Sequence, residues 1–228
     1  MKIYFVRHGH PDYANDCLTE LGHKQALAVS EQLENCEIEQ VFSSPKGRAI
    51  QTAEYTSKIF GLNVIECLFM KEIEWGSING EPILYDGHPW HTIDFLSAQG
   101  KDLADKEWDK KEPFCNNKMV NSVKNVTEGL DAWLLNLGYK REGDYYRVAG
   151  KSTNKSVAMF SHGGSSSAAL SHLLNIPFPQ FCGAFRPELT SITVVELSDN
   201  EGEFCYPRLL IFNDTRHIDS CSNIFYGV

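Results

Sequence analysis

The stretch that decides the fold is KIYFVRHGH at residues 2–10, an apolar run that ends at His8 and Gly9. A nearly continuous apolar run of this length is typical of a central strand that is covered on both faces. The same pattern occurs in SVAMFSHGG at 156–164, where an apolar run is followed by His162 and a glycine. We therefore expect two strands of one sheet, each delivering a histidine and a glycine at its end.

Six segments rich in β-branched and aromatic residues predict strands. They are Ile3–Val6, Gln40–Ser43, Asn63–Leu68, Ser156–Phe160, Ser191–Leu197 and Arg208–Phe212. The last two flank the turn-rich sequence DNEGE at 199–203 and are expected to form a hairpin.

Helical patterns alternate with these strands. One helix is expected from its cap Thr19 to about Asn35, a second from Pro45 to Gly61, and a fourth from Ser165 to Leu174. The third has one apolar face and ends at a glycine: Val123, Val126, Leu130, Trp133, Leu134, Leu137 and Gly138. Strand–helix alternation predicts an α/β protein, a three-layer αβα sandwich with a mostly parallel sheet of about six strands, in one domain over 1–228.

Residues 77–120 break this alternation. They contain GHPWH at 87–91 and the mixed-charge run KDLADKEWDKKEP at 101–113. We interpret them as an insertion packed over the sheet edge as a lid, and the alternative is a partly helical surface excursion without substrate contact. Four residues in or beside this segment would either line a substrate site or fill a small core under the lid, and the core reading is favoured for most of them: Trp75, Trp90, His91 and Trp108.

The composition restricts the partners. The chain has 228 residues, a formal net charge of −9, 42% hydrophobic and 22% charged residues, as in soluble globular proteins. The negative charge argues against nucleic acid or an anionic membrane as the main partner, so an anionic substrate must be attracted by a local basic pocket. A homodimer through a sheet edge is left open.

The ends and cysteines suggest a cytoplasmic protein. The N-terminus MKIYFVRHGH is too short and too soon charged for a signal peptide, and no apolar stretch approaches the roughly 20 residues that span a bilayer. Seven cysteines without CxxC spacing favour reduced thiols over disulfides or zinc. His88 and His91 have the spacing of a metal pair, but no third ligand is evident nearby, so we expect no metal and no other cofactor.

The polar residues that follow the strands are expected to meet. In open parallel sheets, ligands bind beyond the carboxyl ends of the strands. His8 and His162 each follow a strand, and Arg48 lies one helical turn beyond Ser43 and Ser44, which close another. Arg7 and Arg48 offer forked donors to phosphate oxygens, and Gly163 permits close backbone approach.

One imidazole in such a pocket can act as a nucleophile. Nearby Arg7 and Arg48 should depress the pKa of His8 and keep it neutral, and a local backbone carbonyl would fix its tautomer. The general acid that a leaving oxygen requires is expected in KEIEWG at 71–76, at Glu72 or at the competing Glu74. Taken singly, each of these motifs could be structural; their joint order along the chain is what favours a phosphate site.

These motifs resemble those of the histidine phosphatase superfamily, the phosphoglycerate mutase-like enzymes. The resemblance extends over nearly the whole chain: VRHGH at 6–10, LTELGHKQA at 18–26, SSPKGRAIQTA at 43–53, KEIEWG at 71–76, FSHGG at 160–164 and FNDTRHI at 212–218. It implies an αβα sandwich, a phosphohistidine on His8, and a phosphoryl group held by Arg7, Arg48 and His162. It further implies Glu72, rather than Glu74, as the proton donor, and a supporting place for His217.

Two departures from the family pattern bear on function. The family's phosphate-binding asparagine position is Ala14 here, and Asn15 beside it could replace that contact only if the loop shifts. Leu18 follows Gly9 by only nine positions, so the longer insert that helps mutases hold phosphoglycerate is missing. The sequence therefore predicts a phosphomonoester hydrolase for a small phosphorylated metabolite. The alternatives are a phosphoglycerate mutase-type enzyme and a non-catalytic module that binds a phospho-ligand.

Overall fold

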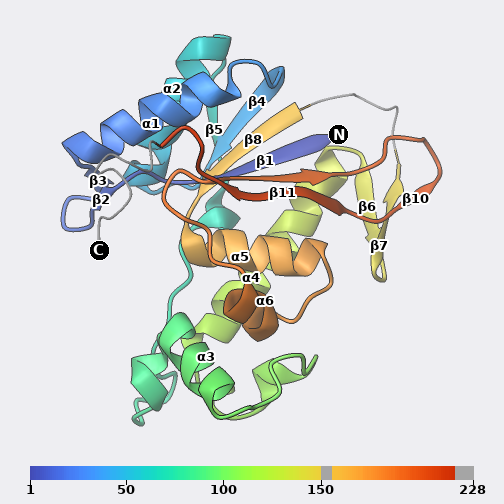
Figure 1. Cartoon of the computed structure of the whole chain (residues 1–228). Coiled ribbons are helices and arrows are strands. Elements are labelled where there is room, and N and C mark those ends of the chain that lie inside the picture. Colours follow the sequence, from blue (N-terminus) through green and yellow to red (C-terminus); the bar gives the residue numbers. More distant parts are fainter. Residues whose placement is uncertain (150–155, 219–228) are drawn as a thin grey trace.

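The computed structural model describes residues 1–149 and 156–218, and a six-stranded sheet lies at its centre (Figure 1). The order is β11–β9–β1–β8–β4–β5. The strands β1, β8, β4 and β5 run parallel to one another. β9 runs antiparallel to its neighbour β1, and β11 runs antiparallel to β9. The bounds are β1 Lys2–Arg7, β4 Ile38–Ser43, β5 Val64–Glu66, β8 Ser156–Ser161, β9 Ile192–Glu196 and β11 Arg208–Asp214. All six predicted strands and the mostly parallel sheet are confirmed.

The pairing of β9 with β11 confirms the predicted hairpin, but its connection carries a further strand. β10 (Phe204–Cys205) pairs with β7 (Tyr145–Val148), which in turn pairs with β6 (Tyr139–Glu142) in a second, three-stranded sheet. This sheet was not predicted because its strands are short and carry charged residues that interrupt the apolar pattern. The same holds for the two-residue strands β2 (Pro11–Asp12) and β3 (Cys17–Leu18).

The four predicted helices are present, with small differences in their ends. They are α1 Glu20–Leu33, α2 Gly47–Phe60, α4 Lys118–Asn136 and α5 Gly163–Leu173. Thr19 caps α1 by accepting a hydrogen bond from Gly22 N at 3.1 Å, and Gly61 ends α2 in the left-handed conformation. The predicted start of α5 at Ser165 is wrong by two residues, because the glycines that suggested a turn belong to the first turn of the helix.

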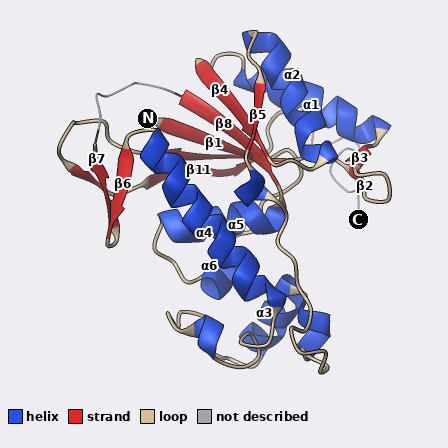
Figure 2. Cartoon of the chain, turned by 180° about the vertical axis from the view of Figure 1, so that it is seen from behind, coloured by secondary structure: helices blue, strands red, loops and turns tan. Residues whose placement is uncertain are grey.

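The pleat of the sheet directs alternate side chains to two helix layers (Figure 2). Ile3 and Phe5 of β1 belong to a core that includes α4 and α5 residues such as Leu130 and Leu170. Val6 points to the opposite core, which includes Val29 of α1. The sheet therefore lies between α1 and α2 on one face and α4 and α5 on the other, and the three-layer αβα sandwich is confirmed.

Residues 77–120 form the 3-10 turns Leu84–Gly87 (η2) and Trp108–Lys110 (η3) around helix α3 (Pro89–Ala98). Helix α3 packs against α6 (Phe178–Ala184), a helix that was not predicted because prolines surround and interrupt its sequence. Figures 1 and 2 place α3 at the far end of α4 and α6, well away from the sheet. Helix α3 therefore packs against α6 and not against an edge strand of the sheet, and the interpretation of the segment as a lid stays a prediction.

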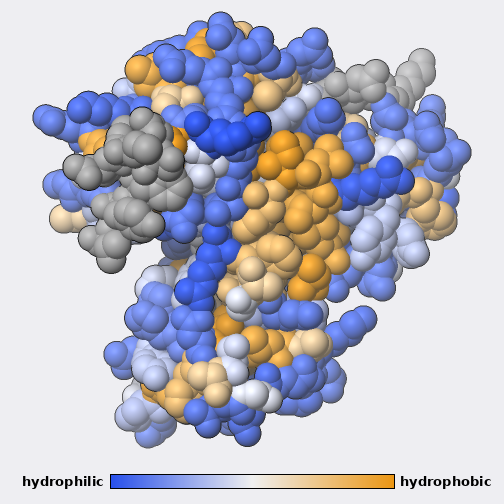
Figure 3. Space-filling model, viewed as in Figure 1, coloured by the Kyte–Doolittle hydropathy of each residue, from blue (hydrophilic) through white to orange (hydrophobic). Residues whose placement is uncertain are grey.

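In the part of the chain that the structure describes, no helix is long and apolar enough to cross a membrane. Six cysteines are free thiols, and Cys221 lies outside the described residues. Apolar surface gathers over the edge strand β11 and the helices below it, where Leu210 and Ile211 are 46% and 41% exposed (Figure 3). Dimerisation through this edge stays a prediction.

Candidate active site

His8 lies immediately beyond β1, and its backbone is fixed on two sides. Its amide donates to Ser161 O of the neighbouring strand at 2.9 Å, and its carbonyl accepts from Thr190 N at 3.3 Å. The ring is 1% exposed, and its Nδ1 lies 2.7 Å from Gly9 O. A carbonyl can only accept, so the ring proton is on Nδ1 and Nε2 keeps its lone pair. Arg48 Nε donates to that lone pair at 3.3 Å, in agreement with this tautomer.

The environment keeps this imidazole neutral. Burial is the largest cause that lowers the pKa of His8 to about 3, followed by the charge of Arg7, with a smaller contribution from Arg48. The hydrogen bond to Gly9 opposes this shift, because it stabilises the protonated ring. The sequence predicted the direction from the two arginines, whereas the larger effect of burial depends on packing that no motif encodes.

His162 caps α5 at the end of β8 and is fully buried. Its Nε2 lies 2.8 Å from Ser44 Oγ, and the ring meets that of His8 edge to face with a centroid distance of 5.1 Å. Burial, and then the neighbouring His8, lowers the pKa of His162 well below its ordinary value. The two histidines predicted to meet at the end of parallel strands are therefore in contact, and both are neutral.

Two buried nitrogen atoms next to His8 have no hydrogen-bond partner among the described residues. They are Arg7 Nε and His162 Nδ1. Arg7 Nη1 donates a hydrogen bond to Pro187 O at 2.8 Å. A buried polar atom without a partner is costly, and atoms of this kind are retained where a ligand pairs with them. Their position beside His8 is that of a binding site for an oxyanion.

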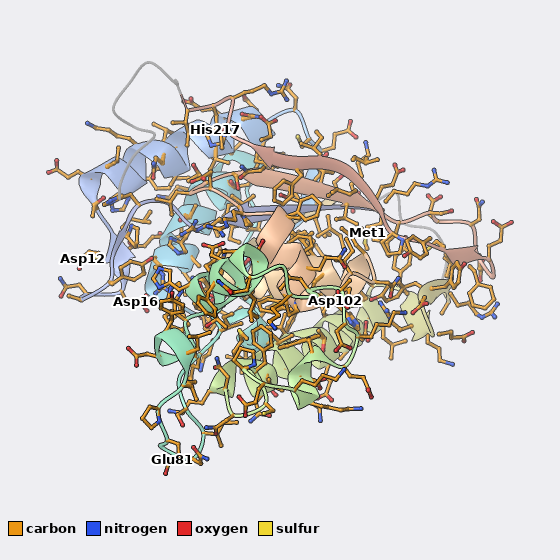
Figure 4. The ribbon with its side chains drawn as sticks, turned by 60° about the horizontal axis from the view of Figure 1, so that its bottom comes forward. Met1, Asp12, Asp16, Glu81, Asp102 and His217 are labelled. Carbon is orange, nitrogen blue, oxygen red and sulfur yellow. The ribbon has the colours of Figure 1, made fainter. Side chains whose placement is uncertain are left out.

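Arg48 is held beside His8 by an acid that the sequence analysis did not select. Arg48 is 7% exposed, and its Nη1 lies 2.5 Å from Asp16 Oδ1. Asp16 also accepts from Gly47 N at 3.1 Å and thereby links the β2–β3 loop to the start of α2. The sequence argument looked for cations around an anion site, so it did not select this acid, which only the fold could identify. Figure 4 shows Asp16 close to Asp12, at the same side of the molecule.

Asn15 is not brought to the cluster. Its side chain is exposed and donates to Asp12 Oδ2 at 2.7 Å, so that Asp12 and Asn15 form a small surface turn. The loop shift that would carry Asn15 to a phosphate is absent from this arrangement, and the contact expected of the family's asparagine is not supplied by this residue.

Glu72 reaches the start of α5 from the loop after β5. Its Oε1 accepts from Ser165 N at 3.1 Å and from Ile73 N at 2.9 Å. A Cβ on Gly164 would lie 2.5 Å from that same oxygen, so glycine is required for this approach. Burial raises the pKa of Glu72 and outweighs the opposing effects of these hydrogen bonds and of Arg7. The carboxyl group thus favours the protonated form, as a general acid needs.

Glu74 lines a second groove, which Glu72 also borders. Its side chain is exposed, its amide donates to Ser122 Oγ at 3.0 Å, and it lines a groove beside Lys118 and Asn121. Glu72 alone of the two competing glutamates lines the pocket that contains Arg7 and Gly163. The geometry therefore favours Glu72 as the acid.

This pocket has a volume of about 320 Å³ and opens between the end of the sheet and the 77–120 segment. Its lining consists of Arg7, Tyr13, Glu72, Trp75, His88, Trp90, Gly163, Arg186, Pro187 and Glu188. Trp75 and Trp90 thus line the pocket, so the core interpretation, which was favoured for most of the four residues, does not describe these two. Trp108 packs between Phe114 and Phe178, as the core reading predicted.

The histidines of the 77–120 segment stack on each other. The rings of His88 and His91 are 4.2 Å apart, and His91 is exposed. Within the described residues, no group of three or more His, Cys, Asp or Glu side chains is arranged to hold a metal ion.

His217 supports the site from behind. Its Nδ1 lies 2.9 Å from Gln32 Oε1 and its Nε2 lies 3.1 Å from Thr190 Oγ1, and Thr190 in turn contacts the backbone of His8. Burial lowers the pKa of His217 to about 4. This placement agrees with the supporting role that the sequence resemblance implies.

The lowered pKa values predict that acid destabilises the protein. His8 and His217 take up protons near pH 6.5 when unfolded but only near pH 3 and 4 when folded. The unfolded state therefore binds more protons between these limits, and stability falls as pH falls through this window. Each histidine costs up to about 1.4 kcal/mol per pH unit. The raised pKa of Glu72 acts in the opposite direction.

Urea unfolding from pH 7 to pH 4 measures this effect. A His217→Gln variant, which keeps hydrogen-bonding capacity but cannot titrate, is expected to lose stability less steeply than the wild type. Equal slopes for the two proteins would show that His217 is not held neutral in the folded state.

A family comparison agrees with the geometry. The model of the histidine phosphatase superfamily (branch 1) matches residues 3–206 of this chain. The chain belongs to the histidine phosphatase superfamily, and the predicted family membership is confirmed. The match includes the segments that carry His8, Arg48, Glu72 and His162.

Similar proteins include both mutase-like and phosphatase names. A probable phosphoglycerate mutase, GpmB, of Yersinia pestis is 24% identical over 186 residues, which cover 78% of this chain and 76% of the relative. A phosphoserine phosphatase of Entamoeba histolytica, solved with 3-phosphoglyceric acid, has 23% identity and a TM-score of 0.63, with 95% and 98% of the two chains covered. A mycobacterial glucosyl-3-phosphoglycerate phosphatase has 21% identity and a TM-score of 0.64, with 93% and 98% covered. At these identities the solved structures establish a common fold.

Proposed function

We propose that this protein is a phosphomonoester hydrolase that acts on a small phosphorylated metabolite through a phosphohistidine on His8, with no metal or cofactor. The observation that carries the proposal is the lone pair on Nε2 of a buried, neutral His8, fixed by the Nδ1–Gly9 hydrogen bond. Arg7 Nε and His162 Nδ1, which have no hydrogen-bond partner among the described residues, lie beside it, and burial raises the pKa of Glu72 at the same pocket.

In the first step, His8 Nε2 attacks phosphorus and the bond from phosphorus to the leaving oxygen breaks. Glu72 gives its proton to that oxygen and becomes a carboxylate. Arg48 Nε, which donates to Nε2 at the long distance of 3.3 Å, turns to a phosphoryl oxygen. Arg7, His162 and the amide of Gly163 bind the remaining oxygens and stabilise the charge that they carry in the transition state.

In the second step, water attacks the phosphohistidine. The Glu72 carboxylate takes a proton from this water, the bond from phosphorus to Nε2 breaks, and inorganic phosphate leaves. His8 regains its neutral form with the proton on Nδ1, and Glu72 regains its own proton. Positioning and electrostatic stabilisation supply most of the catalysis in reactions of this type.

A mutase is the second candidate, because the GpmB relatives are named as probable phosphoglycerate mutases. A mutase must hold an intermediate with a second anionic group and exclude water. Here the loop between Gly9 and Leu18 is short, and Arg186, a further cation of the pocket, is ion-paired with Asp94. Both features favour transfer to water.

Release of inorganic phosphate tests the proposal. The assay uses p-nitrophenyl phosphate, sugar phosphates, nucleotides and phosphoglycerates with EDTA present, and it follows phosphoglycerate isomerisation in parallel. Turnover of monoesters that survives EDTA is expected. Isomerisation in place of phosphate release would identify a mutase, and phosphate binding without either reaction would identify a non-catalytic module.

A further inference from the structure

The part of the pocket beyond the phosphate site is lined by aromatic rings. Trp90 Cη2 would lie 3.8 Å from a Cβ placed on Gly163, so this indole borders the phosphate site directly. His88 joins Trp90 to Trp75, with ring centroids 6.0 Å and 5.0 Å apart, respectively. Tyr13, which is 68% exposed, lines the same pocket from the β2–β3 loop.

These rings offer a stacking surface that their own packing does not use. Trp75 is 41% exposed and Trp90 is partly exposed, and both line the pocket. Exposed indole faces next to a binding site gain free energy when a flat or CH-rich ring covers them. The leaving group of the substrate occupies this position, because the phosphoryl group itself is bound by Arg7 and His162.

The charges of this outer region do not favour a second anion. Arg186, on the loop before β9, is half exposed and pairs with Asp94. Glu188 lines the same pocket, and no ion pair of its side chain is present among the described residues. The Asp94 carboxylate thus already pairs with Arg186, and Glu188 adds a negative charge to the lining, so a substrate carboxylate or second phosphate finds no unpaired cation in this lining beyond Arg7. Arg7 and Arg48 are committed to the phosphoryl group.

From these observations, and on the basis of the proposed function, we infer that the enzyme selects phosphomonoesters whose leaving group carries an uncharged ring, and that Trp75, Trp90 and Glu188 determine this choice. The two tryptophans bind the ring, and Glu188 disfavours substrates with a second anionic group. Phosphoglycerates are poor substrates on this account.

The test compares benzyl phosphate with ethyl phosphate, since both leave as unactivated alkoxides and differ mainly in the ring. Glucose 6-phosphate and 3-phosphoglycerate complete the panel. We expect kcat/KM for benzyl phosphate to exceed that for ethyl phosphate and for 3-phosphoglycerate by about 10-fold or more, in line with the stacking of one ring. If kcat/KM for glucose 6-phosphate also exceeds that for ethyl phosphate, the tryptophans bind a sugar ring as well as an aryl ring. If it does not, the preference is restricted to aryl rings.

Variants assign this preference to residues. Trp90→Leu is expected to reduce the benzyl-to-ethyl ratio towards one, and Trp90→Phe should restore part of it, which a purely structural role would not do. Glu188→Gln should raise kcat/KM for 3-phosphoglycerate relative to benzyl phosphate by several-fold. The matched controls are Phe95→Leu, an exposed ring of α3 outside the pocket, and Glu81→Gln, an exposed acid of the same segment.

Calorimetric binding of benzylphosphonate and 3-phosphoglycerate separates the inference from the proposed function, because binding needs no turnover. Tighter binding of benzylphosphonate without hydrolysis of any monoester supports the ring preference and overturns the phosphatase proposal alone. Hydrolysis with equal kcat/KM for benzyl and ethyl phosphate, or with 3-phosphoglycerate preferred, overturns the ring preference alone. An equal fall in kcat/KM for benzyl phosphate and ethyl phosphate in Trp90→Leu also overturns the ring preference.

Discussion

His8→Ala is expected to lower turnover of every phosphomonoester by at least about 10³-fold while the fold persists. The substitution removes the imidazole whose Nε2 lone pair accepts from Arg48 and whose ring meets that of His162. In the proposed mechanism His162 does not replace it, because its Nε2 pairs with Ser44 Oγ and its Nδ1 binds a phosphoryl oxygen. Without the phosphohistidine, water must attack the substrate directly, and the raised pKa of Glu72 disfavours the carboxylate that would have to act as its base.

The fold should tolerate this change. Alanine fits the backbone of His8, whose hydrogen bonds to Ser161 and Thr190 do not involve the ring. Loss of the Gly9 contact and the small cavity cost about 2 kcal/mol together. The measurement is steady-state phosphate release with circular dichroism as a check on folding, and His23→Ala, a histidine of α1 that contacts Tyr55 away from the pocket, is the control.

Retention of even a tenth of the wild-type activity by His8→Ala would exclude the phosphohistidine mechanism. The intermediate itself can be sought by rapid quench at alkaline pH, where a phosphoramidate bond survives. Labelled phosphate bound to the wild type and absent from His8→Ala is the expected outcome.

The parts of this site that could be predicted are those encoded by short, continuous stretches. A buried strand followed by His8 and Gly9, or by His162 and Gly163, combines a strand pattern with the chemistry at its end. The topology of parallel strands then requires these ends to meet. The core strands and the helices with capping residues follow from the same local rules, and their bounds agree within a few residues.

The parts that could not be predicted depend on contacts between distant segments. Asp16 acts on Arg48 only because the β2–β3 loop folds back onto α2. Trp75 and Trp90 carry no pattern that distinguishes a pocket wall from a core, and the packing of α3 on α6 decides between the two. Asn15 is a different case, because a local turn with Asp12, three residues away, binds its side chain at the surface.

Glu72→Gln is the second large prediction, and its effect is expected to depend on the leaving group. Glutamine keeps the oxygen that accepts from Ser165 N and Ile73 N, so the loop and α5 stay in place. It cannot donate an acidic proton. For an alkyl phosphate, whose alkoxide leaves poorly, kcat/KM should fall by about 10²–10⁴-fold. For p-nitrophenyl phosphate the stable phenolate needs no proton, and kcat/KM should fall by less than about 10-fold.

The raised pKa of Glu72 gives this comparison a pH dependence with a definite sign. Alkyl phosphate hydrolysis requires the protonated acid, so its kcat/KM should decline as pH rises through the raised pKa of this group. The glutamine variant should lack this decline. Glu74→Gln makes the same chemical change two residues away in an exposed position and should alter neither substrate by more than about twofold.

The same variant also separates the two chemical steps. Glu72 returns as a base when water attacks the phosphohistidine, so its loss slows dephosphorylation whatever the first leaving group was. With p-nitrophenyl phosphate, the first step therefore stays fast while kcat falls. Rapid mixing should yield a burst of about one nitrophenolate per active site, followed by slow turnover. Equal losses for alkyl and aryl substrates, with no burst, would mean that Glu72 stabilises the site without transferring a proton, and the acid would then have to be sought elsewhere in the pocket.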